Sequence, residues 1–101
     1  MSSLPLPGTV PAPVESRPTD PSRRVAFAVR AGADPGALPR VLELFAKRGL
    51  VPAALTSRLH DDALAMEIEM AGLARAESDH IANCLRQIPM VTQVLTTEQA
   101  A

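Results

Sequence analysis

The spacing of large apolar residues changes along the chain, and each spacing predicts one element of secondary structure. In "RVAFAVR", residues 24–30, every second residue is large and apolar, which predicts a strand whose buried face carries Val25, Phe27 and Val29. In the stretch that follows, apolar residues recur at intervals of three and four. This spacing predicts an amphipathic helix with core positions Leu38, Val41, Leu42 and Phe45.

The residues around this helix predict where it begins and ends. Asp34 can accept hydrogen bonds from the free N–H groups of the first turn, and Pro35 suits the first helical position. Gly49 is typical of the position just beyond a helix C-terminus. Because Pro39 would press on the carbonyl of Pro35 in a regular helix, we expect a loose or 3₁₀-like first turn.

A hairpin is predicted next. Residues 50–59 and 63–72 read as its two strands, with a turn at His60–Ala63 and a break at Gly72. The second strand has the clearer alternation, with a buried face formed by Leu64, Met66, Ile68 and Met70. Pro52 lies near the start of the first strand, where a missing N–H donor is tolerated.

The end of the chain predicts a second helix and a last strand. Residues 74–88 carry a helical apolar stripe and stop before Pro89; the stripe consists of Ile81, Leu85 and Ile88. Residues 90–97 are rich in β-branched side chains and predict a closing strand. Residues 98–101 are expected to fray.

The predicted order is therefore β-α-β-β-α-β over residues 23–97. This order favours an α+β, ferredoxin-like sandwich: a four-stranded antiparallel sheet with two helices on one face. Residues 1–22 contain six of the ten prolines and have no strand or helix period. We interpret them as a disordered or polyproline-like tail, which is either a solubilising extension or a ligand for a proline-recognising module.

Composition narrows the classes of partner. The chain has 101 residues, enough for one domain, and its formal net charge of −1 gives no bulk attraction to nucleic acid or to an anionic membrane. With two aromatic residues there is no stacking platform for single-stranded nucleic acid. A single cysteine, Cys84, excludes an internal disulfide and a cysteine-cluster metal site. This cysteine usage fits a protein of the reducing cytoplasm.

Few side chains could carry chemistry. His60, beside Asp61 and Asp62, predicts a solvated turn, with a metal or acid–base site as the alternative. His80 is interpreted as a surface or half-buried residue of the second helix. Cys84 lies at the edge of that helix's apolar stripe and is interpreted as a small hydrophobe, since nothing in the sequence promises the base that a nucleophile needs.

The remaining candidates also have simpler structural explanations. Met66, Met70 and Met90 have the spacing of strand core, with a thioether metal cluster as the alternative. The Glu67 and Glu69 side chains point away from the helices, where Arg24 or Arg30 of the neighbouring first strand could pair with them. The Asp-Pro-Gly-Ala turn lacks the Lys-Ser/Thr of a phosphate-binding loop. We therefore expect no enzyme, no cofactor and no metal.

The stretch from the first strand through the first helix resembles an ACT domain. Closest in character is the regulatory (small) subunit of acetohydroxyacid synthase, also called acetolactate synthase. The similarity covers residues 24–96, and its most specific part is Pro35-Gly36-Ala37-Leu38, followed by Arg40-Val41, Leu44-Phe45, Arg48-Gly49 and Leu55-Thr56. "IANCLRQIPMVTQV" resembles the second helix and last strand of the family.

The resemblance implies a regulatory module that dimerises through a sheet edge and binds a small amino acid at the interface. The implied amino-acid-binding residues are Ala33, Asp34, Gly36, Ala37, Leu38 and Val51. Main-chain N–H groups at the start of the helix would bind the carboxylate, and Gly36 would let it approach because it has no Cβ. Feedback-sensitive relatives carry asparagines where this chain has Ala33 and Val51. Losing one hydrogen bond to a charged group weakens binding roughly 10- to 100-fold, so a degenerate site is expected.

Three hypotheses follow. The leading one is a non-catalytic regulatory subunit that activates or stabilises the catalytic subunit of acetohydroxyacid synthase in branched-chain amino-acid biosynthesis. The second is a stand-alone ACT homodimer that senses a small amino acid and regulates another protein. The third is a small ferredoxin-like enzyme that uses His60 or Asp61. We expect self-association through the face of Ala26 and Ala28 or through an exposed strand edge.

Overall fold

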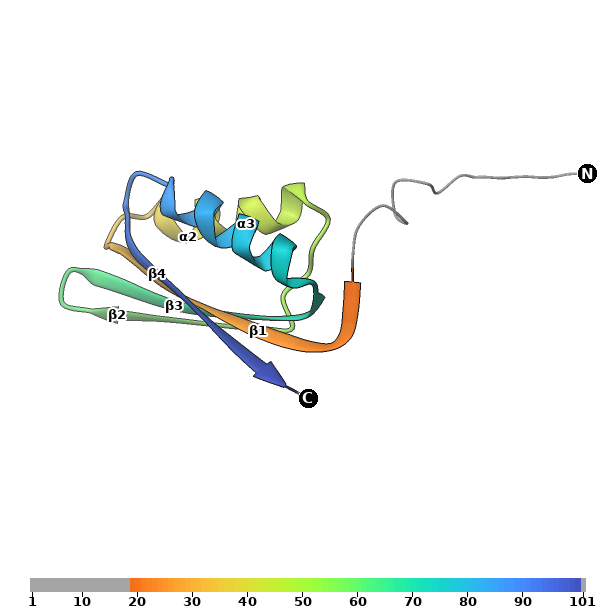
Figure 1. The fold of residues 1–101 in the computed structure, drawn as a ribbon. Coiled ribbons are helices and arrows are strands. Elements are labelled where there is room, and N and C mark those ends of the chain that lie inside the picture. Colours follow the sequence, from red (N-terminus) through yellow and green to blue (C-terminus); the bar gives the residue numbers. More distant parts are fainter. Residues whose placement is uncertain (1–18, 101) are drawn as a thin grey trace, which may run out of the picture.

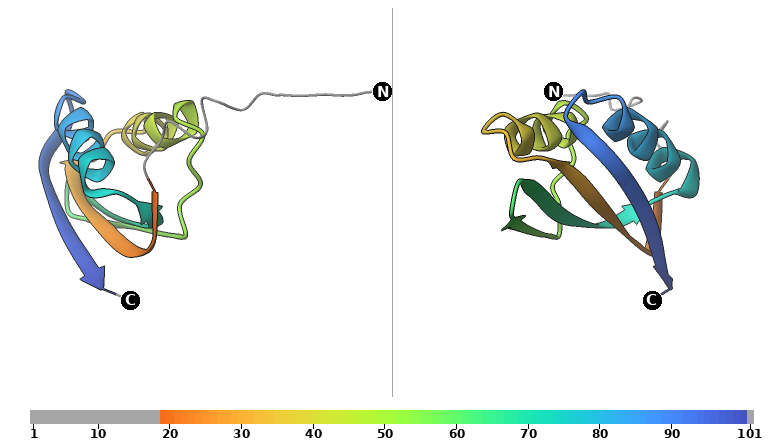
Figure 2. Two further views of the ribbon diagram at one scale, coloured as in Figure 1. Left: turned by 45° about the vertical axis from the view of Figure 1, so that its right-hand side comes forward. Right: turned by 90° about the vertical axis from the view of Figure 1, so that its left-hand side faces the viewer.

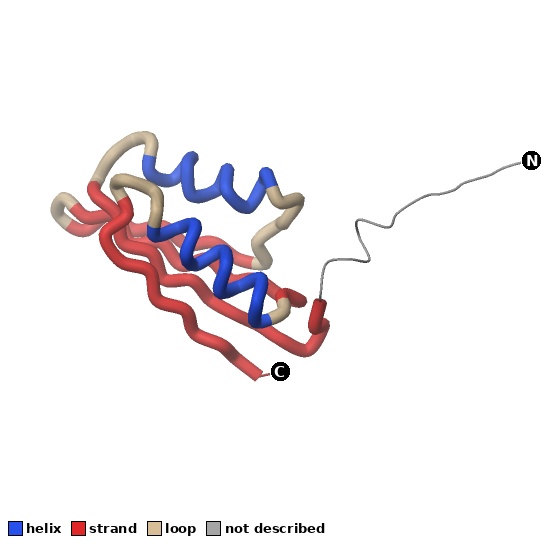
Figure 3. The backbone as a smooth tube through the Cα atoms, turned by 45° about the horizontal axis from the view of Figure 1, so that its top comes forward, coloured by secondary structure: helices blue, strands red, loops and turns tan. Residues whose placement is uncertain are grey.

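The computed structural model describes residues 19–100, and the part of the predicted tail at residues 1–18 lies outside them. The elements follow the order β1 (Thr19–Gly32), α2 (Ala37–Lys47), β2 (Ala54–His60), β3 (Ala63–Leu73), α3 (Arg75–Arg86) and β4 (Val91–Ala100). The strands form one antiparallel sheet in the order β2-β3-β1-β4, and both helices cover the same face of it (Figures 1 and 3). The predicted ferredoxin-like α+β fold is confirmed.

The core lies between the sheet and the helices because the alternating strand residues and the helical stripes point at one another. The two central strands contribute Val25, Phe27, Val29, Met66, Ile68 and Met70, all buried. The helices contribute Ala37, Val41 and Phe45 from α2, and Ile81, Ala82 and Leu85 from α3. The two phenylalanine rings meet edge to face, with centroids 5.9 Å apart. Met66 and Met70 are therefore core positions, as the strand spacing predicts, whereas Met90 lies half-buried in the turn before β4.

Helix α2 ends as its sequence predicts. Gly49 has a φ of +72°, and its N–H donates to the Ala46 carbonyl while the Leu50 N–H donates to Phe45. These two bonds form a Schellman motif, which a left-handed glycine favours. At the other end the helix begins at Ala37, two residues later than Pro35, because Pro35 and Gly36 form a turn. This is the loose start that Pro39 predicts.

The sheet is longer at both ends of the chain than the sequence suggests. β1 begins at Thr19, four residues before the expected start at Arg23, with a register shift against β3 between Asp20 and Arg24. β4 continues to Ala100, so the expectation that the chain frays from residue 98 is wrong for Glu98 and the two residues after it. Glu98, in the extended part of β4, is held by a buried arginine.

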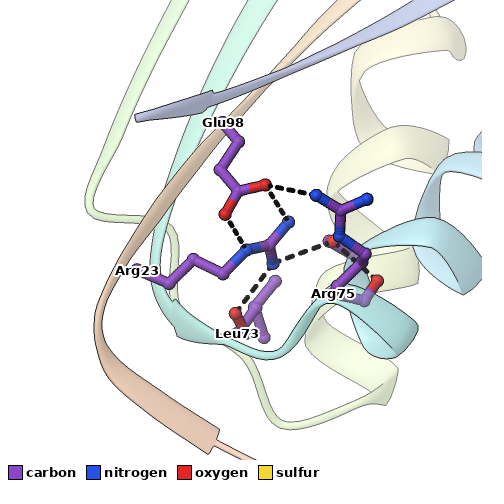
Figure 4. Close-up of polar contacts among 5 residues, drawn as sticks. Arg23, Leu73, Arg75 and Glu98 are labelled. Carbon is purple, nitrogen blue, oxygen red and sulfur yellow. Dashed lines mark hydrogen bonds and ion pairs between the residues drawn. The ribbon is translucent and has the colours of Figure 1, made fainter. Parts of the chain in front are cut away.

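Arg23 joins both ends of the domain (Figure 4). Its side chain is 8% exposed and holds the Glu98 carboxylate with Nε at 2.9 Å and Nη2 at 3.3 Å. Its Nη1 donates to the Leu73 carbonyl at 2.9 Å and to the Ser78 hydroxyl at 3.0 Å. Arg75 adds a third contact to Glu98, at 3.1 Å. Four elements, β1, β3, α3 and β4, therefore meet at one guanidinium group.

Within residues 19–100, no helix covers the other face of the sheet, as the side views show (Figure 2). Edge strand β2 is also poorly covered: all seven of its residues are exposed, including Leu55 and Leu59, which have the same parity as the core residues of β3. Neither helix within residues 19–100 has the length and apolar character needed to cross a membrane.

Candidate functional site

The loop between β1 and α2 is the site that the sequence singles out, and its backbone is tied to its surroundings. The Ala33 N–H donates to the Asp62 carbonyl at 3.0 Å, which links the loop to the β2–β3 turn. The Asp34 N–H donates to the Gly32 carbonyl at 2.8 Å. The loop is therefore anchored at the end of the sheet where β1 ends and the hairpin turns.

Asp34 occupies the start of α2. Its carboxylate oxygen Oδ1 accepts the Gly36 N–H at 2.7 Å, and its carbonyl accepts the Ala37 N–H at 2.9 Å. The side chain of Asp34 therefore satisfies only the N–H before the helix, and the first helical N–H, of Ala37, is satisfied by the main-chain carbonyl of Asp34. These bonds also mean that the amides of Gly36 and Ala37 are not free, contrary to the expectation that they await a carboxylate. Pro35 and Pro39 have no N–H to offer.

The space that Gly36 leaves open is already filled from within the chain. A Cβ at this position would lie 3.3 Å from Asp34 Oδ1 and 3.7 Å from Arg40 Nε. The negative carboxylate of Asp34 therefore stands where an incoming carboxylate would have to approach. A ligand of that kind would displace this side chain, and Asp34 would first have to lose its bond to Gly36.

The predicted amino-acid-binding residues fall into two groups within one chain. Ala33, Asp34, Gly36, Ala37 and Leu38 lie together at the start of α2. Val51 follows the other end of the helix and is 86% exposed. A helix of 11 residues spans ~16 Å, which is longer than a small amino acid. One copy of the chain therefore does not bring both groups to one ligand.

A cluster that the sequence reasoning missed lies beside Cys84. The thiol Sγ lies 3.6 Å from His80 Nε2, one helical turn away, and 3.7 Å from the Arg48 guanidinium. The spacing of four residues between His80 and Cys84 was the available signal. Arg48, which ends α2, could only be placed there by the packing of the two helices. Cys84 is half-buried, as expected at the edge of a stripe.

The other candidates do not assemble into a catalytic or metal site within residues 19–100. No group of three or more His, Cys, Asp or Glu side chains there is placed to hold a metal ion. His60 and Asp61 are exposed at the hairpin turn. The register places Glu67 opposite Ala28 and Glu69 opposite Ala26, and no ion pair described for residues 19–100 includes either glutamate. The expected pairs with Arg24 or Arg30 are absent there.

Comparison with solved structures identifies the architecture. The ACT domain of a GTP pyrophosphokinase from Chlorobium tepidum aligns with a TM-score of 0.66 at 9% identity, covering 73% of this chain and 96% of that one. An ACT domain protein from Streptococcus pneumoniae gives 0.59 at 16%, covering 79% and 91%. The regulatory subunit of aspartate kinase from Thermus thermophilus, in its ligand-free form, gives 0.56 at 11%, covering 79% and 52%. At these identities the likeness concerns the fold alone.

No curated protein matches the sequence significantly. The profile of the ACT-like domain family, however, matches residues 19–101, which includes every strand and helix described above. ACT domains are regulatory modules that bind amino acids and commonly dimerise. The fold and this match agree, and the chain belongs to the ACT-like domain family.

Proposed function

We propose that this chain is a non-catalytic regulatory subunit of acetohydroxyacid synthase, and that it activates or stabilises the catalytic subunit by protein contact. The residues that resemble that subunit most specifically lie in one stretch of the sequence, which forms the loop of Asp34 and Gly36, helix α2 and the start of β2. The proposal places the protein in the cytoplasm, where the thiol of Cys84 would stay reduced.

The observation that carries this proposal is the occupied loop. The Gly36 amide is bound by Asp34, and the two asparagine anchors of feedback-sensitive relatives are replaced by Ala33 and Val51. An amino acid would have to replace a charged internal acceptor without the help of those side chains. The arrangement favours a domain whose regulatory effect comes through its protein partners rather than through strong amino-acid inhibition.

Homodimerisation through β2 is part of the proposal. The loop at Ala33 is bonded to Asp62, so it lies at the end of the sheet where β2 finishes; Val51 precedes the opposite end of β2. If β2 of two copies paired antiparallel, Val51 of one copy would approach the Ala33 loop of the other. A dimer of this kind reunites the two groups that α2 separates in one chain.

The two edges of the sheet differ in a way that favours β2. At the β4 edge, Arg86 donates to the Val94 carbonyl at 3.1 Å, and the pairing of β4 with β1 shifts register between Arg30 and Ala31. Charged side chains and bulges of this kind protect a strand edge from further pairing. β2 is exposed along its whole length and is regular in its pairing with β3.

The exposed leucines of β2 also fit an antiparallel pair. Leu55 and Leu59 are 38% and 63% exposed and lie two residues on either side of Ser57. With Ser57 on the twofold axis, Leu55 of one copy would face Leu59 of the other on the helix side of the sheet. Apolar cross-strand pairs stabilise a sheet by about 0.2–1 kcal/mol each.

Reconstitution with the catalytic subunit tests the functional proposal. We expect the purified full-length chain to co-purify with that subunit and to raise its turnover. Leu59→Lys should remove the β2-edge dimer in sedimentation velocity, whereas Ala46→Lys, on the exposed side of α2, should not. Absence of both binding and rate change with the wild-type chain would refute the regulatory-subunit proposal.

Calorimetry with a panel of small amino acids separates this proposal from the amino-acid sensor. We expect millimolar or weaker affinity for the wild-type chain, because Asp34 holds the Gly36 amide. Asp34→Ala removes that internal carboxylate and should leave affinity unchanged or raise it, while Asp61→Ala, in the hairpin turn, should have no effect. Micromolar affinity of the wild-type chain would favour the sensor.

A further inference from the structure

The outer face of the sheet, opposite the helices, has an arrangement of its own. At its centre, each pair of residues from the two central strands combines an alanine with a charged residue: Ala28 lies opposite Glu67, and Ala65 lies opposite Arg30. The two alanines form a floor of small side chains. The edge strands add Thr56 and Arg58 on one side and Gln93 and Leu95 on the other. The face is therefore low in the middle and carries charge beside alanine at each central pair.

This floor forms a hollow of about 500 Å³. Its lining includes Ala28, Arg30, Arg58, Ala65, Glu67 and Leu95. Leu95 is 55% exposed, although it is a large apolar residue in the middle of a strand. Its lining includes neither the Ala33 loop nor Leu55 and Leu59 of β2, so it is distinct from both features of the proposed function.

This face carries both positive and negative side chains that form no ion pairs with other described residues of the same chain. No ion pair described for residues 19–100 includes Arg30, Arg58 or Glu67. The in-register neighbours of Arg30 and Glu67 on the facing central strand are alanines. A surface with an unpaired acid on β3 and unpaired bases on β1 and β2 is complementary to a copy of itself when a twofold axis passes between the acid and the bases.

We propose that the outer face is a second self-association surface, on which two copies pack sheet to sheet about a twofold axis. Arg30 and Arg58 of one copy then meet Glu67 of the other, and Leu95 reaches over the alanine floor of its partner. Alanine at positions 28 and 65 permits the close approach that long side chains would prevent. This inference does not depend on the proposed function, and it adds a contact that the β2 edge cannot supply.

The size of the face sets the strength of the contact. Four strands spaced ~4.8 Å apart and about nine residues long give a flat area of roughly 500 Å² per copy. A pair of such faces buries about 1,000 Å², which is the lower limit for a specific interface. We therefore expect association in the micromolar range and a marked weakening with salt, because the pairs at the rim are exposed.

Charge reversal on the full-length chain tests the surface. Arg30→Glu and Glu67→Arg should each weaken the association about tenfold or more, because each sets like charges against each other across the axis. An equimolar mixture of the two variants should associate more tightly than either variant alone, since both contacts between positions 30 and 67 of unlike copies are then Arg with Glu. Arg58 of the Arg30→Glu copy still meets the arginine introduced at position 67, so the mixture need not reach the wild-type affinity. Sedimentation velocity from 10 to 500 μM protein, at low and high salt, measures each species.

The controls separate this surface from the β2 edge. Arg40→Glu makes the same charge change at an exposed residue of α2, outside this face. It should leave the sedimenting mass the same as that of the wild type. Leu59→Lys should remove the edge dimer and leave the mixing effect of the two charge variants intact. If both charge variants sediment as the wild type does, or if their mixture shows no association beyond that of either alone, the outer-face proposal is wrong, whatever the fate of the edge dimer.

Discussion

Replacing Arg23 with methionine is the most informative stability test, because this side chain joins both ends of the domain. Methionine keeps much of the apolar stem but removes the donors to the Leu73 carbonyl and the Ser78 hydroxyl. A buried acceptor left without its donor costs about 1–3 kcal/mol, and a lost hydrogen bond to a charged group costs about 1.5–3 kcal/mol. The Ser78 hydroxyl keeps its own bond to the Arg75 carbonyl, so part of the loss is avoided. We therefore expect a destabilisation of about 2–4 kcal/mol.

For a domain of this size, whose total stability is about 4–12 kcal/mol, such a loss is large. The midpoint of thermal unfolding should fall by roughly 10–30 °C, measured by circular dichroism at pH 7. Arg24→Met is the matched control, because Arg24 is adjacent but exposed on the outer face, and its midpoint should change little. A midpoint for Arg23→Met within 2 °C of wild type, on the order of a 0.5 kcal/mol change, would refute the reasoning: the cost of burying the guanidinium would then cancel its bonds.

Three further changes have predictable results. Gly49→Ala places a Cβ on a residue with a φ of +72° and should cost about 1–2 kcal/mol in urea unfolding, whereas a gain would contradict the helix end described above. Phe45→Ala removes a fully buried ring that meets Phe27 and should lower the free energy of unfolding by about 3–5 kcal/mol. This loss is enough to leave the domain partly unfolded when measured by circular dichroism at near-neutral pH. The hydrogen bond from Arg23, aided by the charges of Arg23 and Arg75, lowers the pKa of Glu98 below 4.5; its contribution is therefore fully present above that value and is lost as the pH falls through the lowered pKa. Glu98→Gln should thus lower stability at pH 7 and flatten the acid side of the stability–pH curve, and an unchanged curve would contradict the assigned pKa shift.

The fold could be predicted from local patterns because most of its elements bury one face only. The alternation at Val25, Phe27 and Val29, and the helical spacing from Val41 to Phe45, report directly which side of each element meets the core. Gly49 marked the end of α2 correctly because a left-handed residue there has few substitutes. Pattern reading missed the ends of β1 and β4, since Arg23 and Glu98 are 75 residues apart and look like ordinary surface charges in the sequence.

The candidate site was harder to predict because its state depends on which acceptor each amide finds. The sequence indicated both that Asp34 satisfies the first turn and that the same amides await a ligand, and only the fold shows that Gly36 is already bonded. The cluster at Cys84 needed the packing of α2 against α3, which brings Arg48 to the thiol. Local spacing could suggest His80 at most.

The Arg23–Glu98 contact has a practical consequence for anyone who shortens this protein. A fragment that stops at residue 97, where a sequence pattern alone would place the boundary, deletes the carboxylate and the last three pairings of β4 with Val25, Arg24 and Arg23. The guanidinium would then remain enclosed between Leu73 and Ser78 with no counter-ion from β4. Fragments for expression or for fusion to other domains should therefore retain the chain from Thr19 through Ala100.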